Sequence, residues 1–206
     1  MTTSAEIINY LKKNVDKENY VSMLLVGSKP SELLPGKDLD IFLVIKGRRK
    51  NEFFENLVAK MDKFVEDNPN IIYSFFRGPI KDENKFLIHF VIYTEEKEVD
   101  PNNKEIFINE QRTVLKNLTN SAELISGKSL NELLKKIDLN EKDKINGVLD
   151  KTREKYEILK KENYIDYPEW KKTKEGWKML RTKKLLSKYL RNYLLGYFEK
   201  NLGLKK

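Results

Sequence analysis

The sequence of 206 residues predicts an α+β fold, in which a mixed sheet of four to five strands is backed by helices and followed by a C-terminal α-helical domain. Three observations lead to this prediction. Short apolar runs bounded by turn residues recur in the first half, a helical pattern separates the second run from the third, and the apolar spacing beyond residue 140 is helical. We place the sheet domain at residues 1–98 and the mainly helical domain, with a basic last helix, at residues 99–206.

Two helices are predicted in the sheet domain. The first runs to about Val15, with Thr3 or Ser4 as its capping residue. The second runs from Glu52 to Val65 and stops at the turn sequence that begins at Asp67. The side chains expected to be buried are Ile7, Ile8 and Leu11 in the first helix, and Phe53, Phe54, Leu57, Met61, Phe64 and Val65 in the second.

Four strands are predicted around these helices. Residues 21–26 form a nearly continuous apolar run that fits a strand buried on both faces, and residues 38–45 form the second run. The third and fourth runs cover residues 71–77 and 85–94, and the turn residues between them favour a hairpin connection. Residues 106–108 are a candidate for a fifth, short edge strand.

The second half of the sequence is predicted to be helical. The polar connection at residues 95–104 separates it from the sheet domain, and one apolar face continues from Asn140 to Leu159. The last helix is expected to start near Glu169. The side chains expected on the buried face of this helix are Trp177, Leu180, Leu185, Tyr189, Tyr193, Leu194 and Tyr197.

A candidate seat for phosphate oxygens lies between the first two strands. Gly27 lets a ligand approach the backbone, Ser28 can cap the helical turn that we expect to follow, and Pro30 suits the start of that turn. Unpaired N–H groups at a helix start bind phosphate, and Lys29 adds a positive charge. We therefore predict that Gly27, Ser28 and Lys29 bind phosphates.

Asp38 and Asp40 stand one residue apart where the second strand begins. The two-residue period of a strand puts both carboxylates on one face, with Cα atoms about 6.5 Å apart, and turns Leu39 and Ile41 to the other face. Two such carboxylates can hold Mg²⁺ while a triphosphate supplies further oxygens, as metal-assisted phosphoryl transfer requires. The alternative interpretation is a turn and strand edge without a ligand.

Together, the Gly27-Ser28 turn, the spacer of nine residues and Asp38-Leu39-Asp40 entering an apolar strand resemble the DNA polymerase β-type nucleotidyltransferase superfamily, in its minimal or aminoglycoside-modifying forms. The resemblance covers about residues 1–95. It implies a nucleotidyltransferase sheet, an NTP as substrate and Mg²⁺ or Mn²⁺ as cofactor. It also implies that Asp38 and Asp40 are catalytic metal ligands.

His89 departs from the pattern of this family. Many members carry a third carboxylate on a later strand, as ligand or general base, and the matching place here is His89 in residues 87–91. A neutral imidazole can bind a metal or accept a proton near neutral pH, so His89 is the third candidate catalytic residue, although imidazole prefers softer metals than Mg²⁺. A hydrogen-bonded structural histidine is the alternative, and Asp82, Glu83 or a glutamate of the helical half would then supply the carboxylate.

The composition narrows the classes of function. The sequence has no cysteine and a single histidine, which leaves no disulfide, no thiolate zinc site and no cysteine nucleophile. No signal region and no membrane-spanning run is present, so we expect a cytoplasmic protein without a membrane partner.

The net charge of +8 is uneven. Residues 167–206 hold 12 Lys and Arg against 3 Asp and Glu, which makes RNA a candidate partner for this segment, the alternative being a solvated basic face.

Three functions follow from the sequence. The first is a nucleotidyltransferase that moves an NMP from an NTP to an acceptor hydroxyl, with a small molecule, an RNA and a protein all open as acceptors. The second is a catalytically impaired module of the same fold that binds RNA or a protein partner, which the presence of His89 favours. The third is a regulatory protein that modifies or covers a partner toxin. The sequence leaves the oligomeric state open.

Overall fold

A computed structural model of the protein describes residues 3–27, 29–30, 32–76, 82–94, 122–129, 132 and 152–204. Residues 152–161 of this chain are helical. The other elements, in chain order, are α1 (Ser4–Asn14), β1 (Tyr20–Val26), β2 (Asp38–Ile45), the 3₁₀ turn η1 (Gly47–Arg49), α2 (Lys50–Glu66), β3 (Ile71–Ser74), β4 (Phe86–Thr94), β5 (Glu123–Gly127), β6 (Tyr164–Thr173), β7 (Gly176–Leu185) and α8 (Lys188–Leu202).

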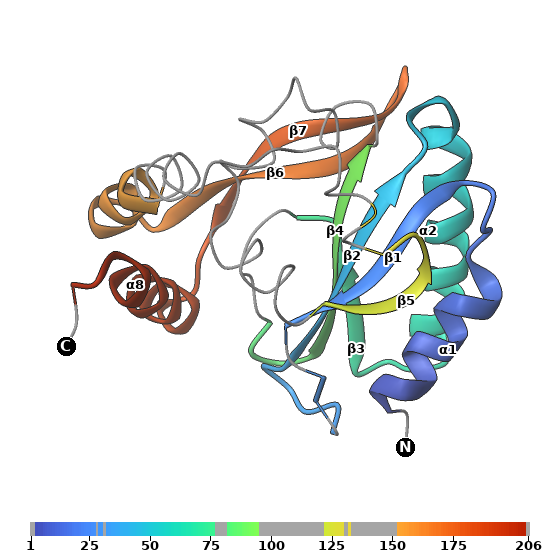
Figure 1. Ribbon diagram of the computed structural model, residues 1–206. Helices are drawn as coiled ribbons and strands as arrows, with labels where there is room; N and C mark the ends of the chain where they lie inside the picture. Colours follow the sequence, from blue (N-terminus) through green and yellow to red (C-terminus); the bar gives the residue numbers. More distant parts are fainter. Residues whose placement is uncertain are drawn as a thin grey trace.

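The central element is a mixed sheet with the strand order β3-β4-β2-β1-β5 (Figure 1). β1 pairs with β2 and β5 in antiparallel fashion, whereas β4 pairs with β2 and β3 in parallel. This sheet and its helices confirm the predicted α+β class. The predicted hairpin between the third and fourth strands is wrong, because the two strands run parallel and the chain must return to the same end of the sheet between them.

Helices α1 and α2 cover one face of this sheet (Figure 1). Their apolar stripes bury the predicted residues, except that Val65 is only partly buried. Thr3 caps α1 through a capping box: its side chain accepts from the backbone N–H of Glu6, and Glu6 accepts from the backbone N–H of Thr3. Alternate residues of β2, such as Leu39 and Ile41, point into the same core. The remaining face of β2 is therefore the face that carries Asp38 and Asp40.

The prediction that the last helix starts near Glu169 is wrong. Instead of the start of a long helix, residues 164–185 form the antiparallel hairpin β6–β7, whose turn ends at Gly176 with a φ of +99°. Side chains of β7 differ widely in exposure: Trp177 is buried, whereas Leu180 and Leu185, which were expected inside, are 40% and 80% exposed. The last helix starts only at Lys188.

Two tryptophans attach the hairpin to the sheet domain. The indole of Trp177 stacks on Phe54 of α2 with 4.5 Å between ring centroids, and the indole N–H of Trp170 donates to the carbonyl of Ile92 at 2.9 Å. The backbone N–H of Trp177 donates to Asn51 Oδ1 at 2.9 Å. The hairpin therefore completes the core beneath the sheet.

Helix α8 packs on the other half of the hairpin. Ser187 caps it by accepting from the backbone N–H of Leu190, and Gly203 ends it with a φ of +71°. The shared apolar cluster consists of Phe76, Leu159, Ile165, Tyr167, Leu190, Leu194 and Phe198. Phe76 lies just after β3 and bridges to Glu169 of β6, so this cluster begins at the edge of the first sheet.

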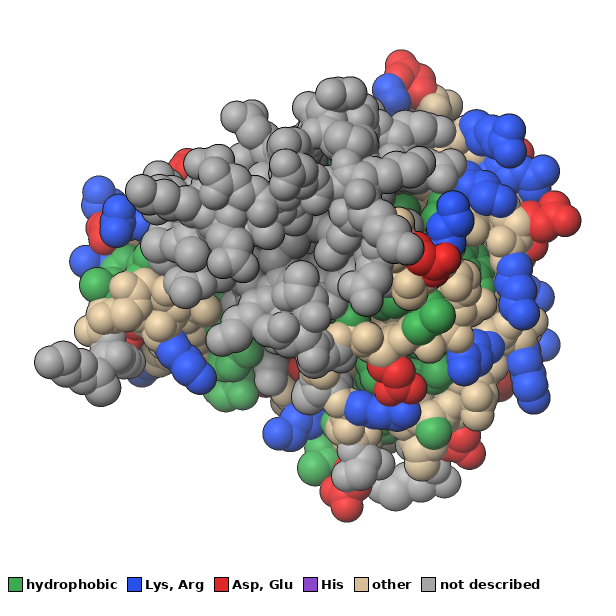
Figure 2. Space-filling view, viewed as in Figure 1, with side chains coloured by type: hydrophobic (Ala, Val, Ile, Leu, Met, Phe, Trp, Pro, Cys, Tyr) green, Lys and Arg blue, Asp and Glu red, His purple; other side chains and the backbone are tan. Residues whose placement is uncertain are grey.

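The domain boundary at residue 98 and the candidate strand at residues 106–108 lie outside the described residues and stay predictions. The predicted helical half does supply one strand, β5, to the first sheet. On the face shown in Figure 2, Lys and Arg side chains lie over α1 and α2 as well as over the C-terminal elements, with Asp and Glu among them. No helix of the described residues is long and apolar enough to span a membrane.

Candidate active site

Asp38 and Asp40 lie at the start of β2, on the sheet face opposite to α1 and α2. Both are partly exposed, whereas Leu39 and Ile41, which alternate with them, are fully buried. The parallel pairing of β2 with β4 places Asp38 opposite Leu87 and Asp40 opposite His89. The structure thus brings together the two predicted metal ligands and the third candidate catalytic residue.

His89 is held between two acceptors. Its Nδ1 lies 2.8 Å from Asp40 Oδ1, and its Nε2 lies 2.6 Å from the carbonyl oxygen of Phe76. A carbonyl oxygen can only accept, so Nε2 carries a hydrogen and donates it. An ionised Asp40 can also only accept, so Nδ1 donates as well and the ring is an imidazolium. Neither ring nitrogen is then free to bind a metal or to take a proton.

The surroundings of His89 favour this charged form. Burial alone would lower its pKa, but the hydrogen bond and the charge of Asp40, the carbonyl of Phe76 and the charge of Asp38 outweigh burial and raise the pKa above the ordinary 6.5. A buried imidazolium beside two carboxylates leaves the site with a single net negative charge. With a third carboxylate in place of His89, the site would have carried three negative charges.

Gly27 closes the other side of Asp40. Its φ is +78°, and a Cβ placed on Gly27 would lie 3.1 Å from Asp40 Oδ2. The two oxygens of Asp40 therefore face neighbouring strands, Oδ1 toward His89 on β4 and Oδ2 toward the end of β1. A side chain at position 27 would be strained by the positive φ and would crowd the carboxylate.

The predicted helical turn after Gly27 is wrong, since no described residue between Gly27 and Asp38 is helical. The described part of this segment is held by single contacts instead: the carbonyl of Pro30 accepts from the Ser4 hydroxyl at 2.5 Å. Lys29 pairs with Glu123 of β5 at 3.6 Å, with both side chains largely exposed. Ser28 lies outside the described residues, so its predicted role with phosphate stays a prediction, as do those of Gly27 and Lys29.

Helix α8 faces the carboxylates from across the site. Burial raises the pKa of Tyr193, and the negative charges of Asp38 and Asp40 raise it further. One turn earlier, the hydroxyl of Tyr189 would lie 4.0 Å from a Cβ at Gly36, in the loop that leads to Asp38. Both tyrosines were expected in the core, because their i, i+4 spacing is equally typical of a buried stripe.

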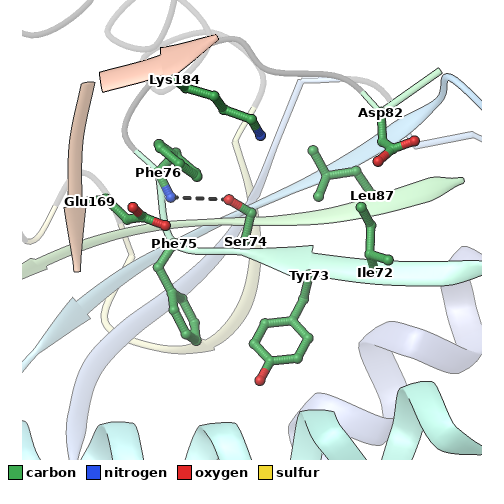
Figure 3. Close-up of a pocket in the computed structure, with 9 residues that line it drawn as sticks. All are labelled: Ile72, Tyr73, Ser74, Phe75, Phe76, Asp82, Leu87, Glu169 and Lys184. Atoms are coloured by element: carbon green, nitrogen blue, oxygen red, sulfur yellow. Dashed lines mark hydrogen bonds between the residues drawn. The ribbon is translucent and has the colours of Figure 1, made fainter. Parts of the chain in front are cut away.

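A cavity of about 220 Å³ lies beside this site, on the same face of the sheet (Figure 3). Strand β3 and the residues after it form one wall, and the hairpin contributes Glu169 and Lys184. Figure 3 shows Lys184 extending over the space that Ser74 and Asp82 border. The described residues that line it are Ile72, Tyr73, Ser74, Phe75, Phe76, Asp82, Leu87, Glu169 and Lys184. From the sequence, Asp82 was a candidate third carboxylate and Lys184 belonged to the basic segment 167–206. The other lining residues were not candidates, because their proximity depends on the hairpin that was predicted as a helix.

The oxygens of Asp38 and Asp40 suit a small divalent ion. Mg²⁺ and Mn²⁺ prefer hard oxygen donors, and Mg²⁺ is commonly held by one or two carboxylates together with water and substrate phosphates. His89 engages Asp40 Oδ1, so Asp40 Oδ2 and the carboxylate of Asp38 are the candidate donors among the described residues. Among the described residues, no group of three or more His, Cys, Asp or Glu side chains is placed to hold a metal.

No protein-family model matches the sequence, and no curated protein matches it. Among solved structures, the fold is similar to the crystal structure of spectinomycin adenyltransferase AAD(9) from Enterococcus faecialis with ATP and spectinomycin. The two chains are 19% identical, the match covers 76% of this chain and 68% of that chain, and the TM-score is 0.47.

Proposed function

We propose that this protein is a nucleotidyltransferase that moves an NMP from an NTP to an acceptor hydroxyl, with a divalent ion at Asp38 and Asp40. One observation supports this proposal most. The two carboxylates share a face of β2, and Gly27, which has no side chain, borders Asp40 on the side of Oδ2. This arrangement offers a metal site and an open approach for phosphate oxygens at the same place.

The reaction is a single displacement at phosphorus. A bond forms between the acceptor oxygen and the α-phosphorus, the bond from the α-phosphorus to the β-bridging oxygen breaks, and pyrophosphate leaves. The proton of the acceptor hydroxyl passes to water. Such a transfer needs alignment of the two reactants and stabilisation of the charge on the phosphoryl oxygens, and little covalent chemistry from the protein.

Each residue has a defined part in this proposal. Asp38 and Asp40 Oδ2 would hold Mg²⁺ or Mn²⁺, which when bound neutralises charge on the phosphates. Gly27, with Ser28 and Lys29, would bind the β- and γ-phosphates. His89 acts as a positioning residue, because it fixes the rotation of the Asp40 carboxylate through Oδ1 and so leaves Oδ2 directed toward Gly27.

Nucleotide binding tests the proposal directly. Each of the four NTPs, carrying a fluorescent label on the ribose, is titrated into the purified protein with Mn²⁺. We expect saturable binding of at least one NTP that EDTA removes. The double variant Asp38→Asn, Asp40→Asn should lose it, since both anionic ligands are gone.

The matched control is Asp67→Asn, which makes the same chemical change at an exposed position after α2 and should bind like the wild type. Thermal melts of all variants establish that they are folded. Absence of binding for every NTP in the folded wild-type protein, or equal binding by the double variant, would refute the proposal.

A second candidate function is a non-catalytic module that uses the same fold to bind RNA or a protein. Both ring nitrogens of His89 are engaged in hydrogen bonds, which favours this second function. The position where members of the resembling family carry a third carboxylate then offers neither a metal ligand nor a general base. The non-catalytic module predicts RNA affinity that falls steeply with added salt and that does not change in the double variant. Transfer of label from an α-labelled NTP to any acceptor would count against it.

A further inference from the structure

Strand pairing fixes the position of the cavity relative to the aspartates. Asp40 on β2 is opposite His89 on β4, and His89 is opposite Ser74 on β3. Asp40 and Ser74 therefore stand in one row across the sheet and on one face, about 9.5 Å apart as two strand spacings require. The cavity that Ser74 lines is thus the neighbouring space on the side of His89.

The opposite side of Asp40 belongs to Gly27. In the strand order β3-β4-β2-β1-β5, Gly27 follows β1, so the phosphate approach and the cavity lie on opposite sides of β2. In phosphoryl transfer the attacking and leaving oxygens are roughly in line. If pyrophosphate leaves toward Gly27, as the proposed function requires, the acceptor hydroxyl must approach from the side of the cavity.

The lining of the cavity defines the chemistry of what it can take. Glu169 is mostly buried, and its Oε2 accepts no hydrogen bond: Lys171 Nζ lies 3.1 Å away but outside hydrogen-bonding geometry, so the contact is electrostatic only. Asp82 accepts two backbone N–H groups through Oδ1. Lys184 supplies the positive charge, with its Nζ 4.8 Å from the centroid of the Phe76 ring. Ser74 adds a hydroxyl.

We propose that this cavity is the acceptor subsite, and that it receives a small, uncharged, polyhydroxylated group of about one ring. The proposal rests on the proposed function for its direction of attack. Hydroxyl groups both donate and accept, which matches a lining that combines two carboxylates, an ammonium group and a hydroxyl. Glu169 Oε2 is paired with Lys171 by charge but accepts no hydrogen bond, so it keeps acceptor capacity for a hydroxyl donor.

The size and charge of the cavity argue against the other acceptors. Its volume of about 220 Å³ is below the roughly 300–1,000 Å³ of pockets for drug-sized ligands. The end of an RNA would bring phosphates toward Glu169 and Asp82, where Lys184 is the one cation among the described lining residues and Lys171 is already paired with Glu169, and like charges at short distance repel. A neutral polyol meets neither obstacle.

Binding of named probes tests the inference without nucleotide. The protein is labelled with ¹³C at isoleucine and leucine methyl groups and titrated with myo-inositol, methyl α-glucopyranoside, inositol hexakisphosphate or a short oligoadenylate. We expect the two neutral probes to shift the methyl signals of Ile72 and Leu87, which line the cavity. Ile8, which is buried on α1, provides the internal reference and should not move.

Two variants connect this binding to the cavity. Glu169→Gln and Lys184→Met should each weaken the neutral probes by about tenfold, the effect expected for losing one hydrogen bond to a charged group. Their matched controls are Glu175→Gln and Lys174→Met, which make the same changes at exposed positions in the turn of the same hairpin and should have no effect. Lys184→Met keeps the test valid if Glu169→Gln fails to fold.

The outcomes separate this inference from the proposed function. The acceptor subsite is overturned if neither neutral probe shifts Ile72 or Leu87, if the anionic probes bind the cavity more tightly, or if both variants bind like the wild type. Nucleotide binding at Asp38 and Asp40 can persist in each of these cases. If the neutral probes bind as expected but no NTP binds, the cavity is a polyol site and its assignment as an acceptor subsite is overturned together with the proposed function.

Discussion

Asp40 and His89 form a hydrogen-bonded pair across two parallel strands, with 2.8 Å between Asp40 Oδ1 and His89 Nδ1. The pair divides the Asp40 carboxylate into one oxygen that is committed to the protein and one that faces Gly27. Where a third carboxylate would add a metal ligand, this pair adds a fixed orientation and a positive charge.

The protonation of His89 can be observed directly, because it is the single histidine of the sequence. We expect the pKa of His89 from ¹⁵N chemical shifts to lie above 6.5. In Asp40→Asn the pKa should fall, since the charge that favours the imidazolium is removed. A His89 pKa at or below 6.5 in the wild type would contradict the ion pair.

The raised pKa of His89 also predicts how stability depends on pH. The folded state holds the His89 proton more tightly than the unfolded state, so this contribution is fully present below about pH 6.5 and is lost as the pH rises through the folded pKa. The free energy of unfolding from urea titrations should therefore decline above pH 6.5. In His89→Gln the decline should be smaller, and an equal decline would assign it to another group.

Gly27→Ala separates backbone strain from crowding of the site. A residue with a side chain at a φ of +78° costs about 1–2 kcal/mol, and the new Cβ would also press on Asp40 Oδ2. Gly203→Ala is the matched control, because its φ is +71° but a Cβ there meets nothing within 4 Å. We expect both to lose similar stability in urea titrations, and only Gly27→Ala to lose nucleotide binding. Retained binding in Gly27→Ala would remove Gly27 from the site.

Trp177→Ala tests whether the hairpin belongs to the core of the sheet domain. The indole is buried against Phe54, so its loss should destabilise the whole protein by about 3–5 kcal/mol in urea titrations. Leu185→Ala, on the same strand but 80% exposed, should cost less than about 0.5 kcal/mol. Equal small effects would mean that the hairpin is only loosely attached.

The sequence was sufficient for the parts of the fold that local periodicity determines. The stripe of Ile7, Ile8 and Leu11 and the alternation of Asp38, Leu39 and Asp40 each require only a helical or a strand period, and both were predicted. The hairpin was missed because aromatic and apolar residues in 169–197 also fit helical spacing. The need for glycine at position 176 could not be recognised either, because it depends partly on the side chain of Asn51, which is distant in sequence and leaves no room for a Cβ there. The cavity residues were missed for the same reason, since Glu169 meets Phe76 only through that hairpin.

The stacking of Trp177 on Phe54 has a consequence for how the protein is made. The chain leaves the ribosome with its N-terminus first, so strands β1 to β4 have all emerged once residue 94 is outside the exit tunnel. Until the tryptophans at positions 170 and 177 are synthesised, the nascent chain lacks two of the rings that pack on Phe54. Biosynthesis therefore passes through a stage with an uncovered aromatic surface, and a fragment truncated after residue 98 would retain that stage permanently as a site for aggregation.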